Sequence, residues 1–367
     1  MNKKYIAAAG IVGIIVLSVI IGIVIKKASI DKVQATEETT VLITTEATEN
    51  TIETEQEETT DGVKYESHFN PYTGLYSDSE LTDRRPIVVM LDNQYLARPQ
   101  AGLDEADVIY EILAEGLITR YMAVFYGDLP DHIGPVRSSR PYFVEKAYEF
   151  DPYYVHVGGS MQALSDIRKY SLADIDGLTS GAFWREKHKS IPHNMYTSSE
   201  AIIKDGNRLG YKTSINPNFI KFNESFTELK GSNAKEITFV YKDPVKTDPT
   251  GYYTSYIYND EEKVYYRYTN GSPHNDEDSK TQLTCTNILV QYAKTAVIDN
   301  EGRLDIDLTT TGTGKYYTGG KFIEVAWSKK SVDALTEFFD LDGQPIQLNP
   351  GKTWIQVMKI GREEIIK

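Results

Sequence analysis

The segment Gly134–Pro141 gathers residue types that bind anions, and it reads GPVRSSRP. Arg137 and Arg140 supply planar guanidinium groups that match a carboxylate or a phosphate. Ser138 and Ser139 add hydroxyl groups, and the final proline suits the first position of a helix, whose free N–H groups attract negative charge. The segment therefore predicts an anion-binding site. The alternative is that Ser139 caps the helix while both arginines pair with local acids.

The run His156–Ser160, HVGGS, is a second candidate because a predicted strand passes through a glycine turn into a predicted helix. Gly158 and Gly159 allow a ligand to approach the backbone closely. His156 and Ser160 place an imidazole and a hydroxyl at the two ends of this turn. The spacing matches neither the nucleophile elbow G-x-S-x-G nor a phosphate-binding glycine loop. A helix cap is therefore favoured over a nucleophile for Ser160.

The third candidate is the segment Arg185–Asn194, REKHKSIPHN, which is predicted to be a loop. Arg185, His193 and Asn194 have side chains that can bind or position a ligand. His188 and His193 are not at the i, i+4 spacing of helical zinc ligands, and the single cysteine of the chain lies elsewhere. We therefore expect no metal here. A solvated basic loop is the alternative interpretation.

A fourth polar stretch, His274–Asp278, reads HNDED. It lacks the later glycine and glutamate of an EF-hand loop, so a solvated turn is favoured over a calcium site. No motif typical of a nucleotide or another cofactor occurs in the sequence, and we expect none to be bound.

These candidates lie on elements that alternate between strands and helices. Val108–Ala114 and Ile118–Tyr126 are predicted to form a hairpin, and beyond residue 235 short strands separated by Gly, Asn and Asp dominate. We therefore expect an α+β fold, with a mixed α/β subdomain over 65–212, a junction over 213–234 and a β-rich subdomain over 235–367. The other predicted elements are strands at Ile87–Leu91, Tyr153–Val157, Ile237–Tyr241, Tyr252–Tyr258, Val264–Tyr268, Ile288–Tyr292, Phe322–Trp327 and Trp354–Met358, and helices at Pro141–Phe150, Met161–Tyr170 and Ser198–Leu209.

The start of the chain predicts attachment to a membrane. After a short tail, 1–5, residues 6–25 are uncharged and long enough to cross a bilayer as one helix. Residues 28–64 follow as a stalk, in which Thr36–Thr60 holds ten Thr and eight Glu, a composition that favours disorder. The short tail and the acidic stalk indicate a single-pass protein of the cell membrane with its C-terminal domain extracytoplasmic. The net charge of −14 argues against a nucleic-acid partner.

Several strings in the sequence resemble the YerB-type bacterial cell-envelope proteins, a two-part domain family of unknown function. They are RPIVVMLDN, ARPQAGLDEADVIYEILAEGLITRYMAVF, IGPVRSSRPYF, VHVGGS, IPHNMY, NILVQY, GTGKYYTGGKFIEVAW and LNPGKTWIQV. The resemblance implies an extracytoplasmic module, often anchored by a lipid. This sequence departs from that pattern because its single cysteine, Cys285, does not follow the apolar run. The family supplies no catalytic residue to carry over, so catalytic residues stay unknown.

Three hypotheses follow. The leading one is a membrane-tethered module that binds an anionic cell-envelope ligand, such as a glycan, phosphate or carboxylate group, or an envelope partner protein. The second is an envelope hydrolase or transferase acting on cell-wall glycan or a phosphodiester, with His156 or His193 as general base. The third is a non-catalytic regulator of another envelope enzyme. The site residues that we predict are Arg137, Ser138, Arg140, His156, Gly158, Gly159, Ser160, Arg185, His193 and Asn194.

Overall fold

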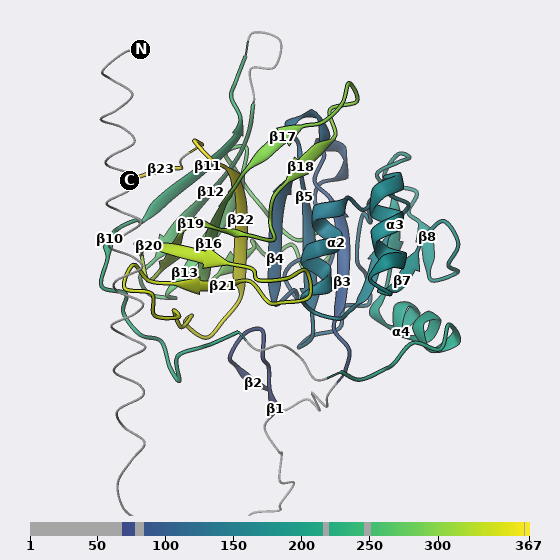
Figure 1. Cartoon of the computed structure of the whole chain (residues 1–367), viewed down its shortest axis with the longest axis horizontal. Helices are drawn as coiled ribbons and strands as arrows, with labels where there is room; N and C mark the ends of the chain where they lie inside the picture. The colour runs from purple at the N-terminus through teal and green to yellow at the C-terminus, as the bar shows by residue number, and fades with distance from the viewer. Residues whose placement is uncertain (1–67, 78–83, 216–219, 246–250, 363) are drawn as a thin grey trace, which may run out of the picture. The chain divides into compact units, whose positions relative to one another are not determined.

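The computed structural model describes residues 68–77, 84–215, 220–245, 251–362 and 364–367 (Figure 1). The predicted membrane span at 6–25 and the predicted stalk at 28–64 lie outside these residues. Within the described residues, no helix is both long and apolar enough to cross a membrane. All of them belong to one compact unit, Lys64–Lys367.

The main feature of this unit is a mixed sheet of eleven strands, counted over the described residues. The strands follow the order β10-β20-β19-β16-β22-β4-β5-β3-β6-β7, with β21 on β20. Its strands are β3 (Ile87–Asp92), β4 (Val108–Leu113), β5 (Thr119–Phe125), β6 (Tyr153–His156), β7 (Ala173–Asp176), β10 (Ser232–Asn233), β16 (Asn287–Ala293), β19 (Thr311–Thr318), β20 (Lys321–Ser328), β21 (Glu337–Phe339) and β22 (Thr353–Lys359). Strands from both predicted subdomains therefore share one sheet.

The parallel pair β4 and β22 joins the two parts of this sheet, with Val108 opposite Thr353 and Ile112 opposite Val357. On its other side, β22 pairs in parallel with β16. Every residue of β4, and all but the last of β22, is buried. Such continuous burial is typical of central strands that are covered on both faces.

Within the described part of the chain, a second sheet has six antiparallel strands in the order β14-β13-β12-β11-β23, with β15 on β13. Its strands are β11 (Glu236–Lys242), β12 (Tyr252–Asn259), β13 (Val264–Thr269), β14 (Ser272–Pro273), β15 (Thr284–Cys285) and β23 (Ile365–Ile366). Short two-stranded sheets complete the strands: β1 (His68–Phe69) with β2 (Tyr76–Ser77), β8 (Phe183–Arg185) with β9 (Met195–Thr197), and β17 (Thr295–Val297) with β18 (Leu304–Ile306).

Neighbouring residues of β4 show how the layers stack, because successive side chains of a strand point to opposite faces. Glu111 accepts a hydrogen bond from Arg267 on β13 at 2.8 Å, so the six-stranded sheet packs on that face. Tyr110 packs against Lys146 and Phe150 at the end of helix α2 (Pro141–Tyr148), which lies over the other face (Figure 1). Arg267 and Glu111 are fully buried at the centre of the two-sheet sandwich.

Helices α2 and α3 (Met161–Lys169) lie on the face opposite the second sheet, near the β3–β6–β7 end (Figure 1). Helix α4 (Ser199–Arg208) packs against Tyr153 of β6, which points to the other face. The 3-10 turns η1 (Tyr95–Ala97) and η2 (Glu115–Leu117) lie in the loops. The side chain of Ser198 accepts a hydrogen bond from the N–H of Ala201, which confirms the predicted cap of α4. The helices, the mixed sheet and the strand-rich C-terminal part confirm the predicted α+β class.

Candidate functional site

The predicted site residues gather at one edge of the large sheet. Strands β3, β6 and β7 run parallel, so their carboxyl ends meet at the same edge. Beyond Val89, β6 no longer pairs with β3, and the segment 135–137 takes its place: Asp92 donates its N–H to Pro135, and Arg137 donates its N–H to Met90. A point where neighbouring strands separate at their carboxyl ends is where open α/β sheets bind ligands.

Asp92, the last residue of β3, holds two of the predicted residues together. Its Oδ2 atom accepts a hydrogen bond from Nδ1 of His193 at 2.7 Å and lies 3.2 Å from Nε of Arg137. Its Oδ1 atom accepts the N–H of Gln94 at 3.0 Å. The carboxylate is almost completely buried, so these contacts fix its orientation. We call Asp92, Arg137 and His193 the Asp92 site.

The outward atoms of the Asp92 site remain available to a ligand. Nε2 of His193 and both terminal nitrogens of Arg137 have no hydrogen-bond partner among the described residues, and the two side chains keep 11% and 28% of their surface exposed. A guanidinium fork with two open N–H groups suits an oxygen anion. Nε2 of the imidazole either donates a hydrogen bond when protonated or accepts a proton when neutral.

A second group of charges lies beside this site. Arg140 makes a two-pronged ion pair with Glu115, and Arg120 lies 3.4 Å from the same carboxylate. Burial and the nearby charge of Arg140 lower the pKa of Arg120 to about 10. Burial favours a raised pKa for Glu115, but the hydrogen bond and charges of the two arginines outweigh it and lower that pKa. Arg140 is therefore paired with a local acid, Glu115, as in the alternative interpretation of the segment Gly134–Pro141.

The two serines of this segment play different roles. The carbonyl oxygen of Ser138 accepts a hydrogen bond from Arg120 at 2.7 Å. Ser139 is buried and its hydroxyl lies 2.6 Å from the hydroxyl of Tyr154. Ser139 does not cap α2, since Arg140 occupies the N-cap position without a side-chain hydrogen bond. The part of the alternative interpretation in which Ser139 caps the helix is thus wrong, because the serine points into the core.

His156 is held at both ring nitrogens. Nδ1 lies 2.9 Å from the carbonyl oxygen of Gly158, and Nε2 lies 2.9 Å from Oδ1 of Asp174. The ring is fully buried. Both neighbours are acceptors, so neither nitrogen is free to take a proton from a substrate. Of the two histidines considered as general base, the structure leaves only His193 with an open nitrogen among the described residues.

The residues of the glycine turn after His156 make local structural contacts. Gly158 has φ +64°, a conformation that L side chains rarely adopt, and donates its N–H to Asp176 at 2.8 Å. Gly159 forms an isolated parallel β-bridge with Ser139. The hydroxyl of Ser160 accepts the N–H of Ala163 at 3.3 Å and caps α3, as favoured from the sequence.

Arg185 and Asn194 pair with each other. Nη1 of Arg185 donates to Oδ1 of Asn194 at 2.7 Å, and Nδ2 of Asn194 donates to the carbonyl oxygen of Glu186 at 2.8 Å. These hydrogen bonds connect the two sides of the β8–β9 hairpin and support the loop that carries His193. Asn194 is buried, so its role is to position the adjacent residue, His193.

The sequence reasoning missed Asp92, Glu115 and Arg120. Asp92 directly follows a buried apolar run. A carboxylate at the end of a buried strand is a sequence signal for a site residue. Arg120 lies directly opposite Asp92 across the β3–β5 pair, a register that the sequence does not encode locally. No sequence signal pointed to Glu115, because its partners come from other segments.

The segment His274–Asp278 differs from the predicted solvated turn. His274, Asp276 and Glu277 are buried. Glu277 binds Lys189, Tyr196 and His188, and Asp276 accepts the N–H of Leu103 at 2.9 Å. The interpretation as a solvated turn is wrong because these side chains anchor the C-terminal part to the N-terminal one. The described residues contain no cluster of His, Cys, Asp or Glu suited to a metal ion.

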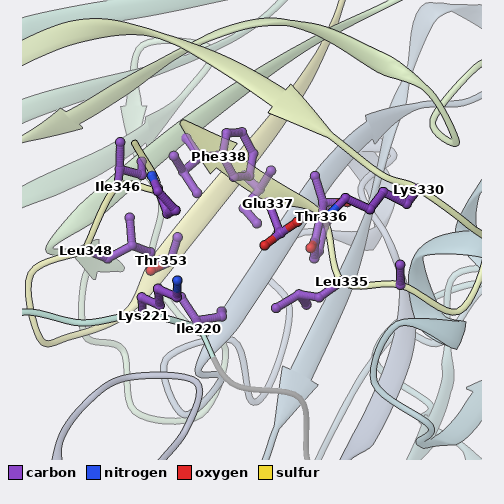
Figure 2. Close-up of a pocket in the computed structure, with 15 residues that line it drawn as sticks. Ile220, Lys221, Lys330, Leu335, Thr336, Glu337, Phe338, Ile346, Leu348 and Thr353 are labelled. Atoms are coloured by element: carbon purple, nitrogen blue, oxygen red, sulfur yellow. Dashed lines mark hydrogen bonds and ion pairs between the residues drawn. The ribbon is translucent and has the colours of Figure 1, made fainter. Parts of the chain in front are cut away.

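Two cavities are relevant to binding. A pocket of about 350 Å³ is surrounded mainly by apolar side chains, among them Phe338, Ile346 and Leu348, with Lys330 and Glu337 at one side (Figure 2). A larger cleft of about 1210 Å³ opens between the N-terminal loops and the second sheet. Its lining includes Gln94 and Ser190, whose backbone atoms are hydrogen-bonded to Asp92 and His193 respectively.

Residues 72–212 match the N-terminal domain, and residues 245–355 the C-terminal domain, of the family described as protein of unknown function (DUF3048). The chain belongs to this family. It is similar to a protein named "Putative lipoprotein YerB" from Bacillus subtilis (strain 168), with 34% identity over 290 residues, 78% of this chain and 85% of that protein. The crystal structure of YerB protein from Bacillus subtilis matches with a TM-score of 0.74 and 33% identity, and covers 82% of this chain and 99% of that one.

Proposed function

We propose that this protein is a membrane-held module of the cell envelope that binds an anionic group at the Asp92 site. The observation that carries the proposal is that one carboxylate holds two side chains with open nitrogens. Oδ2 of Asp92 contacts Nε of Arg137 and Nδ1 of His193, which leaves the terminal nitrogens of Arg137 and Nε2 of His193 open. The name of the relative from Bacillus subtilis supports the location at a membrane.

The buried carboxylate explains how the site is selective for anions. It fixes the orientation of Arg137 and His193, so that the open nitrogens of the two side chains are held in place for an anion. An oxyanion between the two side chains would receive hydrogen bonds from both.

The test is calorimetric titration of the full-length chain, purified in detergent, with inorganic phosphate and with sulfate. Binding is expected for the native sequence, and Arg137→Ala should reduce the affinity about tenfold or more, as for a charge-assisted hydrogen-bonding pair. Arg208→Ala is the matched control, because Arg208 lies on α4 and pairs locally with Asp205. Absence of binding, or equal affinity for Arg137→Ala and the native protein, would overturn the proposal.

A second candidate function rests on the same geometry. A carboxylate that holds Nδ1 of a histidine and leaves Nε2 open is the arrangement of a general base. His193 would take a proton from water while Arg137 stabilises negative charge on a phosphodiester or an acyl group. Turnover of bis(4-nitrophenyl) phosphate or of peptidoglycan that disappears in His193→Ala would support this candidate. Intact substrate after prolonged incubation with the native protein would exclude it for these substrates.

A further inference from the structure

The large cleft between the N-terminal loops and the second sheet is strongly basic. Among the described residues that line it, four side chains are lysine or arginine and one is a carboxylate: Arg98, Lys189, Lys242, Lys280 and Glu277. This balance is opposite to that of the whole chain, whose net charge is −14. A local excess of positive charge in a concave surface attracts anions and concentrates them.

The one carboxylate among the described lining residues, Glu277, is already hydrogen-bonded to other residues of the protein. Oε2 of Glu277 accepts hydrogen bonds from Lys189 at 2.5 Å and from Tyr196 at 2.6 Å, while Oε1 contacts His188. Burial favours a raised pKa for Glu277, but these partners outweigh it and lower the pKa, so the group stays ionised. It neutralises Lys189 and leaves the other cations without an opposing charge from this residue.

Arg98 and Lys280 have only uncharged partners among the described residues. Arg98 donates to the amide oxygens of Asn93 at 2.9 Å and Asn270 at 3.1 Å and lies 4.9 Å from the ring centre of Tyr252. Its Nη2 atom has no hydrogen-bond partner within the described part of the chain. Lys280 is exposed and contacts only the carbonyl oxygen of Glu277. Neither positive charge is therefore compensated by a carboxylate.

The shape of the cleft distinguishes its ligand from a single small anion. A volume of about 1210 Å³ exceeds the usual range for one small molecule, and the cleft lies between segments of the N-terminal and C-terminal parts of the unit. Tyr95 and Leu96, which are 77% and 57% exposed, line one wall and offer apolar surface to a sugar or polyol. Gln94 and Ser190 connect this wall to Asp92 and His193 through hydrogen bonds.

We propose that the basic cleft binds several consecutive units of a linear anionic polymer, a sugar or polyol chain with one phosphate or carboxylate in each repeat. This inference goes beyond the proposed function, because successive anionic groups of the polymer contact Arg98 and Lys280 in the cleft, whose described lining does not include Asp92, Arg137 or His193. The exposed aromatic and apolar wall packs against the uncharged part of each repeat.

The test measures how affinity depends on ligand length. The full-length chain, purified in detergent, is titrated with orthophosphate, pyrophosphate and longer polyphosphates, and in a second series with galacturonate monomers and oligomers. Affinity should rise with length in at least one series, and the series that responds identifies phosphate or carboxylate as the repeated group. The logarithm of affinity for the long ligand should fall steeply with the logarithm of salt concentration, because several charges are neutralised.

Substitutions then localise the effect. Lys280→Gln and Arg98→Gln should each weaken binding of the longest responding ligand by about five- to tenfold and reduce the salt slope by about one, with orthophosphate binding changed less than about twofold. Lys204→Gln is the control, because Lys204 is an exposed lysine on α4 outside the cleft lining. Lys280 is at the surface, so its substitution remains informative if Arg98→Gln fails to fold.

The outcomes separate the two proposals. If Arg137→Ala leaves orthophosphate binding unchanged while length dependence and the Lys280→Gln effect persist, the proposed function of the Asp92 site falls and the cleft still binds a polymer. If orthophosphate requires Arg137 but longer ligands bind no tighter in either series, the polymer inference is overturned. Binding to anionic lipid vesicles with no binding of any soluble oligomer would also overturn it, in favour of a membrane surface as the partner.

Discussion

Asp92 and His193 are joined by a hydrogen bond of 2.7 Å between Oδ2 and Nδ1, although 101 residues separate them in the sequence. The strand end supplies the carboxylate and a loop of the β8–β9 hairpin supplies the imidazole. Because the carboxylate is an acceptor, it selects the ring form that carries a proton on Nδ1. This contact therefore sets which nitrogen of His193 is left open to a ligand.

Replacing Asp92 tests this relationship. Asp92→Asn keeps the size of the side chain but removes the negative charge that holds His193 and Arg137. We expect the preference for a proton on Nδ1 of His193 to be lost and the affinity for sulfate to fall about tenfold, which corresponds to about 1.4 kcal/mol. Nitrogen chemical shifts of the histidine rings and calorimetric titration provide the measurements. An unchanged His193 ring signal would show that Asp92 does not determine which ring nitrogen carries the proton.

The buried pair of Arg267 and Glu111 leads to a prediction about stability. Both side chains are fully buried, and Arg267 also donates to Tyr121 at 3.0 Å and lies over the ring of Trp354. Glu111→Gln would leave a buried guanidinium without an opposing charge. We expect the free energy of unfolding to fall by about 3–5 kcal/mol, measured by urea denaturation.

The matched control for that prediction is the surface pair Lys330–Glu337, whose charged atoms lie 3.1 Å apart and whose side chains keep 75% and 40% of their surface exposed. Glu337→Gln should change the free energy of unfolding by less than about 1 kcal/mol. Equal losses for the two substitutions would mean that the central ion pair has no special role in the sandwich.

Ser160 offers a test that separates a helix cap from a nucleophile. Ser160→Ala removes the acceptor for the N–H of Ala163 and should lower the free energy of unfolding by about 1 kcal/mol, while Ser160→Asp, which restores an acceptor, should recover most of the loss. Denaturation curves measure both variants. If any hydrolytic activity of the native protein vanished in Ser160→Asp with stability retained, the cap would not be its whole function.

Glu105 gives a pH-dependent prediction. Burial and the nearby carboxylates of Asp104, Asp128 and Asp276 raise the pKa of Glu105 from 4.5 to about 7. Between these values the folded chain keeps a proton that the unfolded chain has released, so this group makes stability decrease as the pH rises through that window. Glu105→Gln removes the ionisable group.

We therefore expect Glu105→Gln to raise the melting temperature above pH 7 and to leave it unchanged below about pH 4.5, where Glu105 is protonated in both states. Thermal denaturation over a series of buffers measures the effect. Glu224→Gln, at an exposed position, serves as the control and should show no such crossover. A uniform shift at every pH would show that the carboxyl charge of Glu105 is not responsible.

Local patterns were sufficient to predict many individual elements. The apolar run at 87–91 appears as β3, the hairpin of β4 and β5 forms around Glu115-Gly116 as expected, and α3 and α4 begin after their predicted serine caps. These features depend on side-chain alternation and on hydrogen bonds within a few residues. The chain carries that information over short distances.

Contacts between distant segments could not be predicted in the same way. The side chains of Arg137 and His193 were singled out by residue type, but the buried carboxylate that joins them depends on which strand ends at that edge. The pairing of β4 with β22 and the burial of Arg267 against Glu111 likewise result from the sheet order. Apolar runs identify central strands but do not say which strands become neighbours.

The parallel pairing of β22 with β4 and β16 has a consequence for biosynthesis. Among the strands of the large sheet, β22 is the last to leave the ribosome, yet it occupies a central position between strands made much earlier. Until it arrives, β4 and β16 each present an unpaired apolar edge, and such edges recruit other chains. A product truncated before residue 353 should therefore aggregate rather than persist as a partly working fragment, so that only completely synthesised molecules accumulate.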